Sequence, residues 1–418
     1  MTISPTFTTW LLAATIQHLI PTTLILTTPK RAPIRYIAII FMIWLASLFI
    51  EPITAPSPAR VTVISLVVVA IPQAVNLLLI NPLDDDELCR EQPRRAIFLS
   101  DRIWSALSAV SQSRAIGTSR QVKNVPPQPA YFGCGEKIPR GMFLMRQGLV
   151  LVWQYLACDI VQALARQQGL KQEGVLVFEP IQWQVPLDVW VGRGVQHLIT
   201  WFVVMRLAID SCYRVASIVL VGLGLDEPEH WPPVFGRMLD AFTLRNFWGK
   251  FWHQFLRQPF TAVSSFVARD VLHFSRPSIL EQYTNIFFVF LLSGVLHLMA
   301  NLVDGVPVER SGAMPFFLSM VLGIMIEDGF QAFWTRVHPA ADSTEDTTPW
   351  WKRVVGLAWV FLWLGVTSTW YLHPLSQLPK DEITMVPFSV VERFGLKLIG
   401  GVVLAGGAVL SLMLRCEV

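Results

Sequence analysis

The stretch LRNFWGKFWHQFLRQPF, residues 244–260, gathers aromatic, basic and imidazole side chains in one short segment. Spaced as a helix, it places the aromatic residues on one face and a basic row that includes His253 on another. Such a helix can lie in the lipid headgroup layer, and we expect Pro259 to end it. Periodicity alone therefore favours an interfacial helix, and a chemical site at His253 requires a second group elsewhere in the chain.

A candidate for that second group is His297, in the stretch FLLSGVLHLMANL. Its neighbours Ser293, Asn301 and Asp304 recur three or four residues apart, on one face of an otherwise apolar helix. A His at membrane depth is costly unless it faces protein or a water-filled cavity. An imidazole gains and loses a proton near neutral pH, which suits general acid or base catalysis. A structural His bonded to another helix is the alternative, but the shared polar face favours a lined cavity.

The composition of the chain places these segments in a membrane. Of 418 residues, 53% are hydrophobic and 15% are charged, whereas soluble domains carry roughly a quarter charged residues. Because a crossing needs about 20 apolar residues, we expect an all-α polytopic membrane protein with about nine crossings, eight and ten being the neighbouring counts. We expect residues 1–418 to form a single domain. The expected crossings are residues 8–27, 36–51, 61–80, 141–165, 197–223, 284–303, 313–335, 354–371 and 397–414.

Lys and Arg residues indicate the orientation. With the N-terminus on the non-cytosolic side, 22 of the 33 Lys and Arg fall on the cytosolic side and 8 in the opposite loops. Two long loops, 81–140 and 224–283, then face the cytosol, and the second contains the aromatic-basic stretch, as a cytosolic or re-entrant segment. We therefore expect a soluble substrate or cofactor to be handled on the cytosolic side.

Other classes of partner find no support in the sequence. The net charge of +3 is too small to indicate nucleic acid, and the five cysteines show neither CxxC pairing nor metal-ligand spacing. We therefore expect no metal, and the sequence gives no indication of the oligomeric state.

Charged residues inside the expected crossings have a structural interpretation. Arg206, Asp210 and Arg214, spaced four residues apart, are expected to form an ion-pair ladder that fixes helix packing. Glu327 and Asp328 are expected to hydrogen-bond between helices or to pair with Arg146, with the orientation of a catalytic His as the alternative.

Together, the two histidine stretches resemble a known family. LRNFWGKFWHQFLRQPF is similar to the Trp-His segment of wax-synthase-like proteins in the membrane-bound O-acyltransferase (MBOAT) superfamily. FLLSGVLHLMANL resembles that superfamily's Ser-Gly-x-x-His helix, which supplies its catalytic His. A third patch, SRAIGTSRQVKNVPPQP, resembles a segment of the fungal branch, which includes acetyltransferases of terpenoid and meroterpenoid pathways.

The resemblance implies acyl transfer from an acyl-CoA to an alcohol, inside a tunnel through the membrane helices. His297 is then the general base that takes the hydroxyl proton, and His253 orients or polarises the thioester carbonyl. The residues implied to wall the tunnel or to orient the substrates are Trp248, Trp252, Gln254, Ser293 and Asn301. The cationic residues implied to meet the phosphates of CoA are Arg245, Lys250 and Arg257.

The expected activity is transfer of acetyl from acetyl-CoA, a co-substrate and not a bound cofactor, to a terpenoid-like alcohol. The expected partners are acyl-CoA, a lipophilic alcohol and the bilayer, in the endoplasmic reticulum. A wax-ester synthase, using long-chain acyl-CoA and a fatty alcohol, is the alternative within this class. Outside it, a transporter is expected to show repeat symmetry or paired broken helices, which the sequence lacks. A non-catalytic scaffold gives no reason for a buried His297.

Overall fold

The computed structural model describes residues 7–49, 58–91, 98–129, 132, 137–169, 186–338, 348–378 and 385–415. These described residues form helices and connecting loops, without a strand, which confirms the all-α expectation. The helices at the N-terminal end are α1 (Phe7–Thr27), α2 (Ile34–Ser47), α3 (Pro58–Val75), α4 (Asp85–Glu91) and α5 (Leu99–Ser111). Those in the middle are α6 (Arg140–Gly169), α7 (Leu187–Ile199), α8 (Arg206–Gly222), α9 (Leu244–Asn246) and α10 (Arg257–Phe266). The last are α11 (Ile279–Val303), α12 (Ala313–Val337), α13 (Trp350–Ser376), α14 (Val390–Phe394) and α15 (Leu396–Arg415).

Turns of π-helix extend several of these helices. They are Asn76–Ile80 after α3, Thr200–Met205 between α7 and α8, Phe247–Phe251 after α9, and Val267–Val271 after α10. The π-turn at Thr200–Met205 joins α7 to α8 without a gap in the sequence.

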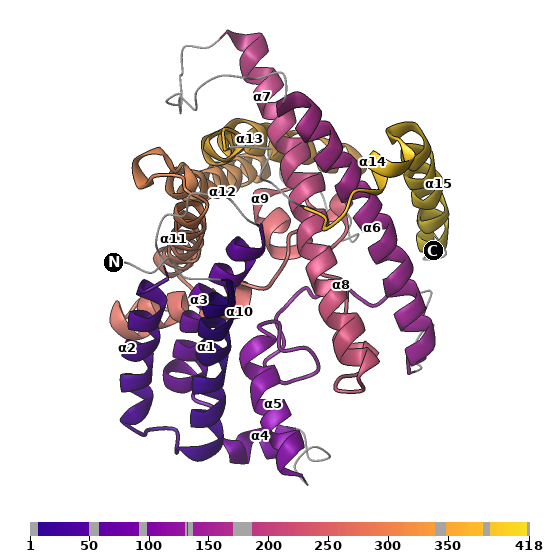
Figure 1. The fold of residues 1–418 in the computed structure, drawn as a ribbon. Coiled ribbons are helices and arrows are strands. Elements are labelled where there is room, and N and C mark those ends of the chain that lie inside the picture. The colour runs from indigo at the N-terminus through magenta and orange to yellow at the C-terminus, as the bar shows by residue number, and fades with distance from the viewer. Residues whose placement is uncertain are drawn as a thin grey trace.

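The helices pack as a series of neighbours around the short central segment (Figure 1). Helices α1, α2 and α3 lie side by side, with α5 against α1 and α3. Helix α11 packs against α3 and α12, and α13 packs against α12 and α7. On the other side, α6 packs against α8 and α15. Because α9 contacts α12, and α10 contacts both α3 and α11, the segment 244–266 is held between helices from different parts of the chain.

Within the described residues, six helical segments are long and apolar enough to cross a membrane. They are Thr8–Thr27, Val61–Ile80, Arg140–Leu164, Ile279–Val303, Val308–Val337 and Trp350–Ser376. Each overlaps an expected crossing, so the multi-pass architecture is supported by length and composition.

The remaining three expected crossings are helical, but they differ from those six. Helix α2 has 14 residues, or about 21 Å of helix, which is short for a bilayer of about 30 Å. Among the residues whose side chains are described, α15 contributes a shorter apolar helix, Leu396–Leu410. The crossing expected at 197–223 forms part of the α7–α8 rod and carries three charged side chains. The count of nine therefore stays a prediction.

Those three charged side chains bear out the ion-pair interpretation in part. The Arg214 Nε atom donates to Asp210 Oδ2 at 2.8 Å, and Gln154 of α6 donates to the same oxygen at 2.5 Å. Arg206 instead lies over aromatic rings, with its guanidinium carbon 5.3 Å from the ring centroid of Phe235. The pair at Asp210 joins α8 to α6, whereas Arg206 faces the loop that follows α8.

The segment 244–257 is not the continuous helix that its periodicity predicts. Helix α9 and its π-turn end at Phe251, Trp252 has an extended backbone with ψ of 155°, and α10 begins at Arg257. The prediction that Pro259 ends the helix is wrong. Pro259 lies in the first turn of α10, where the missing N–H would have no partner within the helix.

The aromatic side of this segment faces protein. Leu244, Phe247 and Phe251 are each 0% exposed, and Trp252 is 4% exposed. They belong to a buried cluster that also includes residues of α11, α12 and α13. The amphipathic pattern therefore reflects a face packed against neighbouring helices, which periodicity cannot distinguish from a face inserted into lipid.

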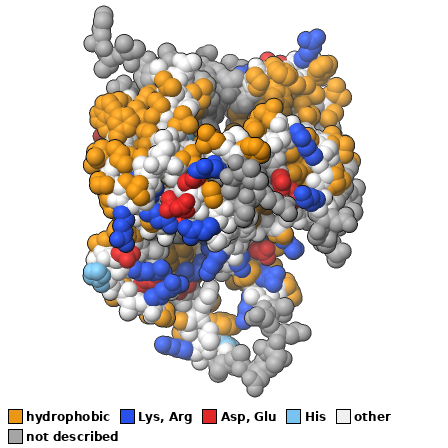
Figure 2. All heavy atoms as spheres, turned by 90° about the horizontal axis from the view of Figure 1, so that it is seen from below, with side chains coloured by type: hydrophobic (Ala, Val, Ile, Leu, Met, Phe, Trp, Pro, Cys, Tyr) orange, Lys and Arg blue, Asp and Glu red, His pale blue; other side chains and the backbone are white. Residues whose placement is uncertain are grey.

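Charged side chains are unevenly distributed over the surface. Figure 2 shows the end of the molecule at which α4 and α5 lie, and Lys and Arg side chains gather there, while hydrophobic side chains cover much of its flanks. Helices α4 and α5 belong to the loop 81–140 that the orientation argument places on the cytosolic side. That this end of the molecule faces the cytosol stays a prediction.

Candidate active site

His297 lies in the second half of α11, about 27 Å of helix from Ile279 and about 9 Å from Val303. Its Nδ1 atom is 2.7 Å from the backbone carbonyl oxygen of Ser293, one turn earlier. Because a carbonyl oxygen can only accept a hydrogen bond, Nδ1 carries the hydrogen and the lone pair lies on Nε2. The helix itself thus fixes the tautomer that has a basic distal nitrogen.

Aromatic rings from two other helices enclose this imidazole. The ring centroid of His297 is 4.3 Å from that of Phe317 in α12, and 5.6 Å from that of Tyr371 in α13. Phe316 packs against both of these rings. Three helices therefore position the imidazole in surroundings that favour an uncharged group and restrict access of water.

The stretch of residues 244–260, called the Trp-His stretch from here on, joins the same aromatic cluster. The Trp248 ring is 6.0 Å from Phe317, which also contacts His297. The Trp252 ring stacks on Trp201 of the α7–α8 connection, with centroids 5.1 Å apart. The structure thus brings together the two stretches that the sequence analysis paired, with Phe317 between them.

His253 packs against aromatic side chains of its own stretch. Its ring is 5.6 Å from Trp252 and stacks on Phe255 at 5.5 Å. Its Nδ1 atom is buried, and no residue in the described part of the chain hydrogen-bonds to it. Burial lowers the pKa of His253 to about 3, and the neighbouring His297 and Arg114 act in the same direction. His253 is therefore a neutral ring with an unpaired nitrogen near His297.

Gln254 and Glu327 hold the ends of the Trp-His stretch. The Gln254 Nε2 atom donates to the carbonyl oxygens of Asn124, at 2.7 Å, and of Gly249, at 3.2 Å. At the other end, Glu327 Oε1 accepts from the Leu244 backbone N–H at 2.6 Å, and also from the indole Nε1 of a Trp in α13, at 2.9 Å. The expected helix-to-helix role of Glu327 is confirmed. The amide nitrogen of Gln254 is engaged within the protein, whereas its buried Oε1 has no hydrogen-bond partner among the described residues.

The other polar residues of α11 differ in their roles. Ser293 is 7% exposed and contributes the backbone carbonyl that orients His297. Asn301 is 1% exposed, and its Nδ2 atom donates to Ser311 Oγ at 2.8 Å. Asn301 therefore secures the connection from α11 to α12, one turn beyond His297. A substrate contact by Asn301 stays a prediction.

The three basic residues expected to meet CoA have different surroundings. Arg245 forms a salt bridge with Asp328, at 2.7 Å. The Arg257 Nη1 atom donates to the carbonyl oxygens of Gly249, at 2.8 Å, and of Lys123, at 3.0 Å. Lys250 is exposed. Their contact with CoA stays a prediction. Arg245 and Lys250 are both exposed, and the charge of Arg245 is paired with Asp328.

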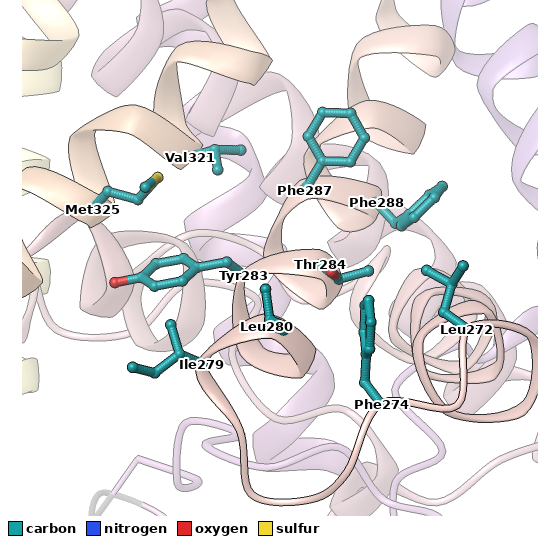
Figure 3. Close-up of a pocket in the computed structure, with 10 residues that line it drawn as sticks. All are labelled: Leu272, Phe274, Ile279, Leu280, Tyr283, Thr284, Phe287, Phe288, Val321 and Met325. Atoms are coloured by element: carbon teal, nitrogen blue, oxygen red, sulfur yellow. The ribbon is translucent and has the colours of Figure 1, made fainter.

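Two neighbouring hollows lie at the start of α11, away from His297. The larger has a volume of about 580 Å³ and the other about 500 Å³. Figure 3 shows the larger one, with Tyr283 from α11, Met325 from α12, and Phe274 from the loop before α11 around it. Neither is lined by His297 or His253, so the expected tunnel stays a prediction. No group of three or more His, Cys, Asp or Glu side chains among the described residues is placed to hold a metal ion.

Several residues of this arrangement escaped the sequence analysis. Phe317, Tyr371 and Trp201 lie in apolar stretches where an aromatic residue has no distinguishing spacing. Arg114 lies within the patch SRAIGTSRQVKNVPPQP, which resembles a segment of the fungal branch but whose spacing does not distinguish Arg114 from its other basic residues. The polar residues and the Pro cluster of that patch are the available signal.

Comparison with known proteins is consistent with this geometry. The family model described as "Membrane bound O-acyl transferase family" matches residues 231–319, a stretch that contains both His253 and His297. "Acetyltransferase spyB" of Aspergillus fumigatus is 39% identical, over 96% of this chain and 70% of the relative. "Acetyltransferase pyr8" of the same species is 37% identical, over 98% of each. "Acetyltransferase TRI7" of Fusarium sporotrichioides is 34% identical, over 86% of this chain and 83% of the relative.

The helical fold, the membrane-length helices and these similarities define an integral-membrane acyltransferase. The chain belongs to the membrane-bound O-acyltransferase family, with fungal acetyltransferases as relatives over most of its length. No solved structure is significantly similar to it.

Proposed function

We propose that this acyltransferase moves an acetyl group from acetyl-CoA to a hydroxyl group of a lipophilic, terpenoid-like alcohol, with His297 as general base. The observation that carries the base assignment is the 2.7 Å contact between His297 Nδ1 and the Ser293 carbonyl oxygen, because it leaves the lone pair on Nε2. The acetyl donor is supported by the relatives, which are named acetyltransferases.

In the proposed reaction, Nε2 of His297 takes the proton of the alcohol as its oxygen attacks the thioester carbonyl carbon. A carbon–oxygen bond forms, and the negative charge develops on the carbonyl oxygen. The carbon–sulfur bond then breaks, and the CoA thiolate recovers the proton from the imidazolium. No covalent intermediate with the protein is required.

His253 is proposed to assist on the donor side. Its neutral ring and its unpaired, buried Nδ1 suit a hydrogen bond to the thioester carbonyl oxygen. Trp248 and Trp252 then exclude water around that carbonyl, which limits hydrolysis of the thioester. On the cytosolic side, in an endoplasmic-reticulum membrane, the exposed Lys250 is proposed to meet a CoA phosphate.

The experiment uses microsomes that contain the wild type or the His297→Ala variant. Each is given labelled acetyl-CoA or palmitoyl-CoA, together with a panel of terpenoid and fatty alcohols. We expect the wild type to form labelled acetyl esters of a terpenoid alcohol, and the variant to form them at least about 100-fold more slowly. Preference for palmitoyl-CoA and a fatty alcohol would instead identify a wax-ester synthase and refute the acetyl assignment.

A further inference from the structure

A buried arginine connects three segments next to His253. Arg114 follows α5 and is 3% exposed. Its Nη1 atom donates to the carbonyl oxygen of Pro233 at 2.8 Å, and Nη2 donates to the carbonyl oxygen of Pro232 at 2.9 Å and to the Tyr213 hydroxyl at 2.5 Å. One guanidinium thus joins the loop after α5, the loop 231–236, and α8.

The same side chain reaches the Trp-His stretch. Its guanidinium carbon lies 5.0 Å from the ring centroid of Tyr213 and 5.7 Å from that of Phe255. The neighbouring Ser113 hydroxyl donates to the Phe255 carbonyl oxygen at 2.5 Å. Because the Phe255 ring stacks on His253, residues 113 and 114 fix both the backbone and the ring beside that imidazole.

The charge of Arg114 is not neutralised by these contacts. Its hydrogen-bond acceptors in the described part of the chain are two backbone carbonyls and one phenol, and none is a carboxylate. Burying a cation without an anion is unfavourable, so the charge of Arg114 costs stability at this position. Arg120, in the same loop, contrasts with it because it is paired with Glu91 at 2.9 Å.

We propose that Arg114 is a positioning residue of the acyl transfer. It fixes the Phe255 ring, which stacks on His253, so that the imidazole faces the reacting carbonyl, and its unneutralised charge stabilises the negative charge that develops on the thioester oxygen. This inference rests on the proposed function, because it requires that a thioester carbonyl lies beside His253 when acyl-CoA is bound.

The test compares Arg114→Gln, Arg114→Lys and Arg120→Gln with the wild type in microsomes, using acetyl-CoA and an alcohol that the wild type acetylates. We expect Arg114→Gln to lower kcat about 100-fold with little change in the KM for acetyl-CoA, since alignment and charge are lost and not CoA binding. Arg114→Lys keeps the charge but cannot donate to the Pro232 and Pro233 carbonyl oxygens together as the guanidinium does. Its kcat should therefore lie between those of Arg114→Gln and the wild type. Arg120→Gln, the matched control, should behave as the wild type.

Four results would overturn the inference. They are a wild-type kcat in Arg114→Gln, a change in that variant confined to KM, equal kcat in the Gln and Lys variants, and failure of both Arg114 variants to accumulate in the membrane. The last would make Arg114 a folding residue. Activity in His297→Ala would refute the proposed base alone, because the Arg114 variants are compared with the wild type and not with that variant.

Discussion

The imidazole of His297 lies against the ring of Phe317, with centroids 4.3 Å apart and 32° between the planes. Phe317 is 2% exposed, and it also contacts Trp248 at 6.0 Å. One side chain of α12 therefore sets the spacing between the proposed base on α11 and the Trp-His stretch. In an active site, an error of about 1 Å in such spacing can cost about 100-fold in rate.

Phe317→Leu should therefore slow the reaction more than it unfolds the protein. The variant keeps an apolar side chain but loses the flat ring against the imidazole, so we expect kcat to fall about tenfold or more. Acetyl transfer in microsomes measures this. Phe330→Leu, on the exposed side of the same helix at 60% exposure, is the control. Equal rates in the two variants would show that Phe317 does not position His297.

Glu327 should stabilise the start of the Trp-His stretch. Glu327→Ala removes the acceptor for the buried Leu244 N–H and for the partly buried Trp359 indole, so two donors lose their partner. We expect a loss of about 2–3 kcal/mol, seen as a lower unfolding midpoint of the detergent-solubilised protein. Glu327→Gln retains an acceptor oxygen and should lose less. If the Ala and Gln variants unfold at the wild-type midpoint, the bonds to Glu327 do not hold this segment.

Gly236 should tolerate no side chain. Its N–H donates to the Phe251 carbonyl oxygen at 2.9 Å, and a Cβ atom at Gly236 would lie 2.1 Å from the Lys250 carbonyl oxygen. Gly236→Ala therefore has to push the loop 231–236 away from the Trp-His stretch, and we expect a loss of acetyl transfer with a destabilisation of about 1–3 kcal/mol. At Gly249, in the same π-turn as Lys250, a Cβ atom meets nothing within 4 Å, so Gly249→Ala is the control. An active and stable Gly236→Ala protein would contradict the close approach.

Acid should weaken the loop that follows α8. Asp226 is buried, which alone would raise its pKa, but hydrogen bonds from His230, Glu227 N–H and Gln112 outweigh burial and hold the pKa below its ordinary value. The stabilisation is therefore complete above the unfolded-state pKa, near 3.8, and is lost as the pH falls below it, towards the folded-state pKa.

The check is the unfolding midpoint of the solubilised protein at neutral pH and at stepwise lower pH below that value. Asp226→Asn should lower the midpoint at neutral pH and flatten its acid dependence. The exposed Asp270→Asn should change neither. An unchanged acid profile in Asp226→Asn would show that this carboxylate does not supply the stabilisation.

The sequence marked each histidine by a local pattern, and the resemblance to the family supplied their pairing. The polar face of α11 and the aromatic row at 244–255 follow from helical spacing, and hydropathy follows from composition. The helix boundaries within the Trp-His stretch could not be predicted from helical spacing. Trp252 is extended because the backbone there turns to join the loop 231–236, where Gly236 N–H bonds to Phe251. A hydrogen-bond partner 15 residues away in the sequence does not change the helical periodicity of the stretch, so periodicity could not predict it.

The roles of Phe317, Tyr371 and Arg114 also could not be predicted from the sequence. An aromatic residue in an apolar helix has the same local pattern whether it faces lipid or an imidazole. The use of Arg114 depends on carbonyl groups at Pro232 and Pro233, about 120 residues later in the chain, which only the fold brings near. The sequence therefore yields candidate residues, and the long-range contacts that arrange them into a site are seen only in the fold.

The most direct test of the central claim is the rate of acetyl transfer by His297→Ala. The measurement uses labelled acetyl-CoA and an alcohol that the wild type acetylates, at equal amounts of membrane-inserted protein. We predict a loss of about 100-fold to 10,000-fold in kcat, as expected for removal of a general base. A rate within a few-fold of the wild type would contradict the assignment of His297 as that base.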